Sequence, residues 1–491
     1  MTNKATSFNI IVIILDAVRA AALSCYGHGV ETTPNLDEFA ARSLMFKRAF
    51  APATWTVPTH ASMLSGLYLS EHRLENIAGD RAFNRQIVTL PEALERSGYH
   101  TAAFSQNFLF APSHNLAGNF REFYPLWNTM PRTRPEQGER RGWRGRMLQL
   151  RQAAGRYQSK RAGLSRAMDT MLDWLIRQTD AAPVFLMANI TNAHYPWAPP
   201  PKDVWGRLGR DSRHLINQEL AQPRPFQFNS GKIGLTGTHR RVWRGLYEAA
   251  VMHVDRELGR FLGNLRRWPG WANSIVFITA DHGELLGEYQ DIVGHTLCLH
   301  DNLLHVPLLV RHPDYETPAT VEGVVQNMDM FSSIVNWAGV DESQVAMPPA
   351  QLQRPSLSEA LAQPHSSSGY AFAEEDYTDS YNPVNGLLKV NPELDPHKFP
   401  QRQIAVRSST HKLVWFDDRP AVFYDLAAGL GEEQDLLNSD TNEARHHLRV
   451  HQDVLAEWRA GLKLFPPRMA DKPARPEAEV TERLRMLGYV A

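Results

Sequence analysis

The chain has few cysteines, no long hydrophobic run and almost no net charge, and each shortage excludes a class of protein. Its 491 residues include only Cys25 and Cys298, too few for a disulfide framework, which fits a reducing compartment. A formal net charge of -1 gives no overall attraction to nucleic acid or to a membrane surface. The apolar run at 10–15 is too short for a signal sequence or a membrane span. We therefore expect a cytoplasmic protein without a membrane span or a nucleic-acid partner.

Short, nearly continuous apolar runs alternate along the chain with longer amphipathic stretches. The runs are residues 9–15, 99–105, 183–190, 274–280 and 305–311. Buried strands that alternate with helices indicate an α/β fold, in which helices cover both faces of a parallel sheet. Ligands of such sheets bind beyond the carboxyl ends of the strands. The polar residues directly after each run are therefore the first candidates for a site.

The sequence pattern changes after about residue 350. Short apolar runs there predict a small antiparallel sheet, and a helical pattern follows over about 441–462. The predicted units are an α/β catalytic domain over 1–350, a sheet-and-helix subdomain over 351–465, and a linker with a terminal docking helix over 466–491.

An insertion over about 106–165 is rich in arginine. It is interpreted either as a solvated insertion or as a lid or patch that attracts an anionic substrate or surface.

Polar residues with metal-binding side chains follow three of the predicted strands. Asp16 comes directly after the first run, His194 follows the third, and Asp281 and His282 follow the fourth. Carboxylate oxygen and imidazole nitrogen together suit a divalent metal ion. A lone aspartate in such a place is also a common helix N-cap.

The stretch TWTVPTHASMLSG, residues 54–66, has the pattern of a helix start. Pro58 suits the first turn, which puts Thr56 at or just before the N-cap. One interpretation is a plain cap. The other is a nucleophile, because anions bind at helix N-termini and a metal-held hydroxyl loses its proton more readily.

Several blocks of sequence occur together in a fixed order. They are NIIVIILDAVRAAALSCYG, TTPNLDEFAARSLMFKRAFAPATWTVPTHASMLSGLY, NAHYPWAPP, ITADHGELLGEY, VGHTLCLHDNLLHVPLLV and FYDLAAGLGEEQDLL. In this order they resemble the sulfatase family of the alkaline phosphatase superfamily over nearly the whole chain. The resemblance implies an alkaline-phosphatase-like, mostly parallel sheet sandwiched by helices, with a smaller C-terminal antiparallel α+β subdomain.

The resemblance also shows where this chain departs from the family. The family's nucleophile segment reads Cys/Ser-x-Pro-Ser-Arg, and its cysteine or serine is converted to formylglycine. Thr56 stands at that position and His60 replaces the arginine. Threonine cannot become formylglycine, so the usual sulfatase nucleophile is absent. Ala17 stands where the family has a second aspartate, which weakens the expected metal site or its surroundings.

The resemblance assigns roles residue by residue. Asp16, Asp281 and His282, together with Thr56, match ligands of one divalent ion, which could be Mn, Zn, Ca or Mg. Thr56 also matches the nucleophile. Three histidines match or neighbour catalytic positions: His194 on the ester or leaving group, His295 on the bound anion, and His60 on the anion or on Thr56. For each histidine a structural hydrogen bond is the alternative, and Asp255 is expected to be structural.

The implied activity is that of a sulfatase-type hydrolase, which cleaves sulfate or phosphate/phosphonate esters through a covalent ester on Thr56. The expected substrate is a small-molecule, saccharide or lipid-headgroup anionic ester, and a homo-oligomer is left open. A threonyl sulfate has to be cleaved by direct attack, which favours phosphorus over sulfur. The alternatives are a soluble phosphoryl transferase or phosphodiesterase with the same site, and a catalytically silent sulfatase-like protein.

Overall fold

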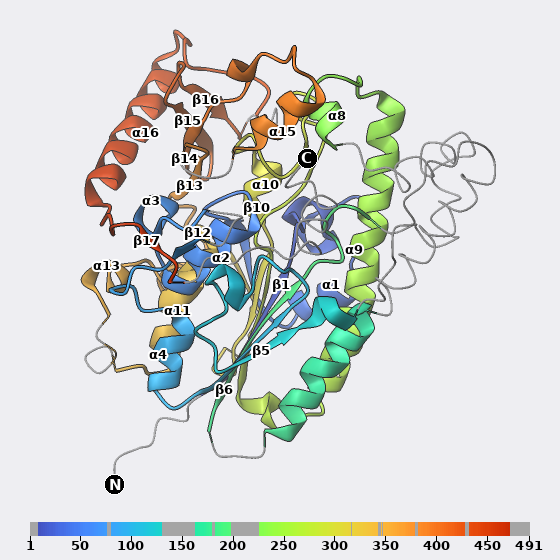
Figure 1. The fold of residues 1–491 in the computed structure, drawn as a ribbon. Coiled ribbons are helices and arrows are strands. Elements are labelled where there is room, and N and C mark those ends of the chain that lie inside the picture. Colours follow the sequence, from blue (N-terminus) through green and yellow to red (C-terminus); the bar gives the residue numbers. More distant parts are fainter. Residues whose placement is uncertain are drawn as a thin grey trace, which may run out of the picture.

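A computed structural model gives the fold of the chain (Figure 1). A nine-stranded sheet forms its centre, in the order β10-β2-β11-β7-β1-β6-β4-β5, with β12 also paired to β2. The structure describes residues 8–75, 80–129, 163–178, 182–197, 225–315, 317–341, 345, 347–378, 382–427 and 432–471. The strands of this sheet are β1 (Asn9–Leu15), β2 (Leu44–Phe50), β4 (His100–Ser105), β5 (Glu122–Pro125), β6 (Val184–Ile190), β7 (Ser274–Thr279), β10 (His305–Val306), β11 (Leu308–Arg311) and β12 (Ala319–Gln326).

The mostly parallel sheet expected from the sequence is confirmed. β7, β1, β6, β4 and β5 run parallel to one another, as apolar strands buried on both faces do. The run at 305–311 is the exception, since it is interrupted at Pro307 and forms β10 and β11 instead of one parallel strand. Both pieces pair antiparallel, β10 with β2 and β11 with β7 and β2. A proline has no N–H for the ladder, which explains the interruption.

Strand β1 shows how helices cover both faces of the sheet. Ile10 and Val12 pack in one hydrophobic cluster with α2 (Thr56–Ser65), α4 (Leu90–Arg96) and α11 (Met330–Trp337). The alternate residues Ile11 and Ile13 pack in a second cluster with α1 (Pro34–Ala40), α9 (Gly237–Leu265) and a helix at 163–177. Successive side chains of a strand point to opposite faces, so one apolar run contributes to both clusters. Figure 1 shows α4 and α11 on one side of the sheet and α9 on the other.

The C-terminal part forms a separate four-stranded antiparallel sheet, as expected. Its strands are β13 (Ala371–Asp376), β14 (Arg402–Arg407), β15 (His411–Phe416) and β16 (Val422–Asp425), and α16 (Asn442–Gly461) packs against it. The expected terminal docking helix and most of the arginine-rich insertion lie outside the described residues. In the described part of the chain, every helix is too short or too polar to cross a membrane.

The stretch 54–66 forms α2, and all of its helical residues are buried. Trp55 occupies the N-cap and Thr56 is the first helical residue, so the cap interpretation of Thr56 is wrong. Gly66 ends the helix with a φ of 68°, and a Cβ there would lie 2.8 Å from the ring of Phe331. The nucleophile candidate is therefore the first residue of a fully buried helix that ends at Gly66.

Acid is expected to destabilise the packing of α2 against α3 (Leu69–His72) through His72. Its Nδ1 accepts from the backbone N–H of Leu74, so Nε2 carries the proton and donates to Ser62 Oγ. Burial lowers the pKa of His72 to about 3. The unfolded chain protonates this histidine below about pH 6.5. Between pH 6.5 and 3 the unfolded state thus binds more protons, and stability falls by about 1.4 kcal/mol per pH unit as the pH drops.

Urea unfolding at pH 7, 6 and 5 measures this effect. The His72→Gln variant should be less stable than the wild type at pH 7 and should lose less free energy of unfolding on acidification. Burial also lowers the pKa of His60, to about 4. His60 therefore adds an equal loss of stability on acidification to both proteins, and this loss cancels in the comparison. Parallel pH profiles of the two proteins would refute the role of His72.

Candidate active site

The register of three neighbouring strands brings the predicted metal ligands together. Ile14 of β1 pairs with Thr279 of β7 on one side and with Asn189 of β6 on the other. Asp16 and Asp281 each follow two residues later, at the carboxyl edge of the sheet. The N–H groups of Ala17 and His282 hold Asp281 through its Oδ1, at 3.2 and 2.9 Å.

Asp16, Asp281 and His282 present three buried polar atoms to one another. His282 Nε2 lies 3.7 Å from Asp16 Oδ1 and 3.5 Å from Asp281 Oδ2. Among the described residues these three atoms have no hydrogen-bond partner, and each side chain is 0% exposed. Burying unpartnered polar groups and like charges costs free energy. A divalent cation would satisfy all three atoms, so this donor set fits a metal ion.

The electrostatics of the three residues agree with this interpretation. Burial, followed by the negative charge of Asp16, raises the pKa of Asp281 to about 7. Burial alone would also raise the pKa of Asp16, but the nearby His194 and His282 and the hydrogen bond from Asn107 outweigh it and lower that pKa. Burial would lower the pKa of His282, but the two aspartates raise it. Two carboxylates in one dry site repel each other, and a cation relieves that repulsion.

Thr56 lies at the same edge of the sheet, and the side-chain amide of Asn107 links it to Asp16. Asn107 Nδ2 donates to Thr56 Oγ1 at 3.1 Å and to Asp16 Oδ2 at 2.8 Å. Asn107 lies two residues after the end of β4. The structure thus brings the predicted nucleophile, the predicted ligand Asp16 and this amide into one hydrogen-bonded group.

His60 lies one turn after Thr56, and both of its ring nitrogens are engaged. Nδ1 donates to the carbonyl oxygen of Thr56 at 2.9 Å, so Nε2 is unprotonated and accepts from Asn189 Nδ2 at 3.1 Å. Asn189 also donates to Asp16 Oδ2 at 3.2 Å. This geometry favours the structural alternative for His60, which orients the start of α2 rather than contacting a bound anion.

His194 and His295 form an imidazole cluster with His282. The ring centroids of His295 and His282 lie 4.5 Å apart, and those of His194 and His295 lie 4.7 Å apart. Burial lowers the pKa of His194 to about 4 and lowers that of His295 as well, so both rings are neutral at pH 7. The three rings also have metal-ligand spacing. His282 Nδ1 is hydrogen-bonded to the Gly283 carbonyl, however. Only its Nε2 can therefore bind a metal ion, together with either the two aspartates or the two other histidines.

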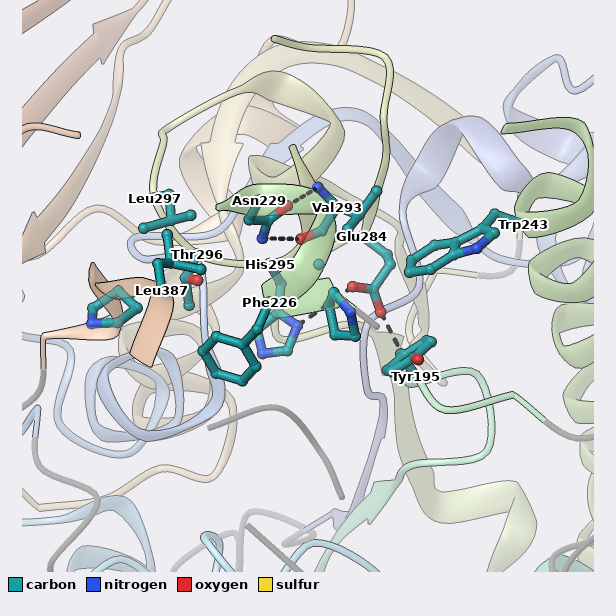
Figure 2. Close-up of a pocket in the computed structure, with 13 residues that line it drawn as sticks. Tyr195, Phe226, Asn229, Trp243, Glu284, Val293, His295, Thr296, Leu297 and Leu387 are labelled. Carbon is teal, nitrogen blue, oxygen red and sulfur yellow. Dashed lines mark hydrogen bonds and ion pairs between the residues drawn. The ribbon is translucent and has the colours of Figure 1, made fainter. Parts of the chain in front are cut away.

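A pocket opens beside this cluster (Figure 2). His295 and Glu284 lie in its polar part, and the carboxylate of Glu284 accepts from His295 Nδ1 at 3.4 Å and from the Tyr195 N–H at 3.4 Å. Its other lining residues are largely apolar or aromatic, among them Phe226, Trp243, Val293, Leu297, Pro383 and Leu387. The described wall therefore suits an apolar group attached to the reacting ester.

Asn189 and Glu284 are site residues that the sequence analysis missed. Asn189 is a single polar residue inside an otherwise apolar run, and Glu284 completes the block Asp281-His282-Gly283-Glu284. Asp255 is structural as expected, because its carboxylate accepts from the N–H groups of Asn35 and Leu36 at the start of α1.

Residues 8–340 match the family model described as Sulfatase. Curated relatives include an arylsulfatase of Clostridium perfringens, 22% identical over 57% of this chain and 64% of the relative. Human iduronate 2-sulfatase is 24% identical over 67% of this chain and 64% of its own length. The matched stretch thus spans somewhat less than two thirds of these relatives.

Solved structures with the same fold include two phosphonate monoester hydrolases. The enzyme of Agrobacterium radiobacter superposes with a TM-score of 0.66 at 22% identity, covering 93% of this chain and 96% of its own. The enzyme of Silicibacter pomeroyi gives a TM-score of 0.67 at 20% identity, with the same coverage. At these identities the likeness establishes the fold.

Proposed function

The chain belongs to the sulfatase family, and we propose that it is a metal-dependent ester hydrolase that uses Thr56 as its nucleophile. The bridge from Asn107 to both Thr56 Oγ1 and Asp16 is the observation that carries the proposal. It holds the hydroxyl beside Asp16, one of three buried residues whose unpartnered atoms suit a cation. The family's usual formylglycine cannot form at this position.

Asp16, Asp281 and His282 would hold the divalent ion through their three unpartnered atoms, with Thr56 alongside. Bound there, the ion would act as a Lewis acid, which would ease loss of the Thr56 proton and neutralise charge on the transferred group. Residues of the protein carry out the rest of the step. Thr56 Oγ1 attacks sulfur or phosphorus, a covalent ester to threonine forms, and the bond to the leaving oxygen breaks.

One proton leaves Thr56 in this step and one joins the leaving oxygen. Both rings are neutral at pH 7, so we propose that the imidazole cluster of His194 and His295 takes the proton from Thr56 and delivers it to the leaving oxygen near His295, which also lines the pocket. Water then attacks the sulfur or phosphorus of the threonyl ester, which restores Thr56 and releases the acid. An acceptor alcohol in place of water would make the same site a phosphoryl transferase.

Phosphorus esters are the better candidates for the substrate. Formylglycine hydrate can expel sulfate by elimination to the aldehyde, and threonine has no such route, so the intermediate must be cleaved by direct attack at its centre. The fold is common to phosphonate monoester hydrolases and to sulfatases, so it accommodates either centre. The apolar pocket wall supports a leaving group with an aryl or alkyl body.

A panel of matched 4-nitrophenyl esters tests the proposal directly. The expected result is turnover of the phosphonate monoester or the phosphodiester, at a kcat/KM at least about 10-fold above that of the sulfate ester, a difference of about 1.4 kcal/mol in transition-state binding. The chain is purified in metal-replete buffer, and nitrophenolate release is followed at pH 7. A wild-type chain that binds the metal and hydrolyses none of the esters would favour the catalytically silent alternative.

A further inference from the structure

Glu375, on the C-terminal antiparallel sheet, lies at the centre of a buried hydrogen-bond network that the catalytic mechanism does not use. It is 1% exposed and belongs to β13. Its Oε1 accepts from the hydroxyl of Thr54 and, at 2.5 Å, from that of Tyr377. Its Oε2 accepts from Gln403 Nε2 at 3.0 Å, and Gln403 stands opposite Glu375 on β14.

The same donors reach the loop that carries His295. The Leu297 N–H donates to the Tyr377 hydroxyl at 3.0 Å, and Gln403 Nε2 donates to the Leu297 carbonyl at 3.1 Å. Both backbone groups of Leu297 are therefore held by partners of Glu375. Leu297 has a φ of 82°, in the left-handed region that leucine rarely adopts. Such a conformation persists only where its surroundings hold it in place.

The two arms of the network end at two parts of the candidate active site. Thr54 precedes Thr56 by two residues, and Leu297 follows His295 by two. The backbone supports the first arm as well, because the N–H of Glu374 donates to the carbonyl of Pro52. Figure 2 shows Leu297 next to Thr296 on the wall of the pocket.

We propose that Glu375 is a positioning residue, through which the C-terminal sheet fixes the start of the nucleophile helix relative to the His295 loop. One buried carboxyl group contacts both segments, so it sets the separation between the Thr56 hydroxyl and the imidazole of His295. Small displacements of reacting groups cost large factors in rate. The kinetic part of this proposal rests on the proposed function, and the structural part does not.

The test uses the full chain and compares two neighbouring carboxylates. Glu375→Gln replaces one acceptor oxygen with a donor, so at least one of its three hydrogen bonds is lost. Glu374→Gln is the matched control, since Glu374 is also buried on β13 but accepts from the Ser70 N–H instead. Tyr377→Phe is a milder second variant, which removes a single hydroxyl.

Hydrogen–deuterium exchange of the peptides containing Thr54 and Leu297 gives the first readout. In Glu375→Gln and in Tyr377→Phe the Leu297 amide should exchange about 10-fold faster than in the wild type, and in Glu374→Gln at the wild-type rate. Unchanged exchange in both test variants overturns the proposal. This comparison needs no substrate, so a wild-type chain without turnover would count against the proposed function alone.

Steady-state kinetics with aryl esters of increasing leaving-group pKa give the second readout. In Glu375→Gln, kcat should fall about 10-fold with KM nearly unchanged, and the loss should grow as the leaving group becomes poorer. A purely structural glutamate would lower stability without this trend. An equal loss of kcat in Glu374→Gln, or faster exchange without any loss of kcat, overturns the positioning role.

Discussion

Thr56→Ala is expected to lower kcat/KM by at least about 1,000-fold, which corresponds to about 4 kcal/mol of transition-state stabilisation. The variant removes the hydroxyl that Asn107 Nδ2 contacts while the same amide donates to Asp16. No covalent ester can form at an alanine, so the remaining rate would come from binding and electrostatics alone. Initial rates on the best ester of the panel measure the effect.

Thr59→Ala is the matched control for this prediction. Thr59 lies on the same buried helix, and its hydroxyl donates to the Ala53 carbonyl rather than to the site. It should lose stability to a similar degree but keep kcat/KM within a few-fold. Thr56→Ser should keep measurable turnover, because it preserves the hydroxyl. Full activity in Thr56→Ala, with a melting temperature near that of Thr59→Ala, would leave Thr56 as a structural residue.

The sequence predicted those parts of the fold in which nearly every residue is apolar, because such residues can be recognised as buried one by one. The runs that became β1, β6 and β7 are nearly continuously apolar, and their bounds lie within a residue of the prediction. Strands β2 and β12 went unrecognised because charged residues interrupt them. Lys47 and Arg48 of β2 pair with Glu322 of β12 at 2.6 and 2.9 Å. The charges are compensated between strands far apart in the chain, which no local pattern reveals.

The candidate site divides in a similar way. Asp16, Asp281 and His282 could be predicted because each directly follows a recognisable strand, and parallel strands bring their carboxyl ends to one edge. Asn189 lies inside an apolar run, so nothing in its neighbourhood distinguishes it from the core. Its role depends on the pairing of β6 with β1. The partners of His60 likewise come from another strand, so sequence spacing could not separate an orienting role from anion binding.

Asp281→Asn is expected to abolish both metal retention and turnover. The substitution removes one of the two negative charges that face His282 Nε2. Metal content should fall from about one ion per chain to below about 0.1, because a neutral amide is a much poorer ligand for a hard cation. Elemental analysis of protein purified in metal-replete buffer measures this. The control is Asp255→Asn, whose buried carboxylate holds the start of α1 and lies in another part of the fold.

The same variant should also raise the stability of the metal-free chain. Without a cation, Asp16 and Asp281 repel each other in a site where burial already raises the pKa of Asp281. The introduced amide ends that repulsion and can donate to His282 Nε2, while its oxygen still accepts from the Ala17 and His282 N–H groups. In the presence of chelator, the free energy of unfolding of Asp281→Asn should therefore be about 1–2 kcal/mol higher than that of the wild type. Binding sites commonly trade stability for function in this way. Asp255→Asn should lose stability with or without chelator, because it breaks hydrogen bonds and relieves no repulsion. The proposed metal site would be contradicted if chelator did not change the melting temperature of the wild type, or if Asp281→Asn still bound one ion per chain.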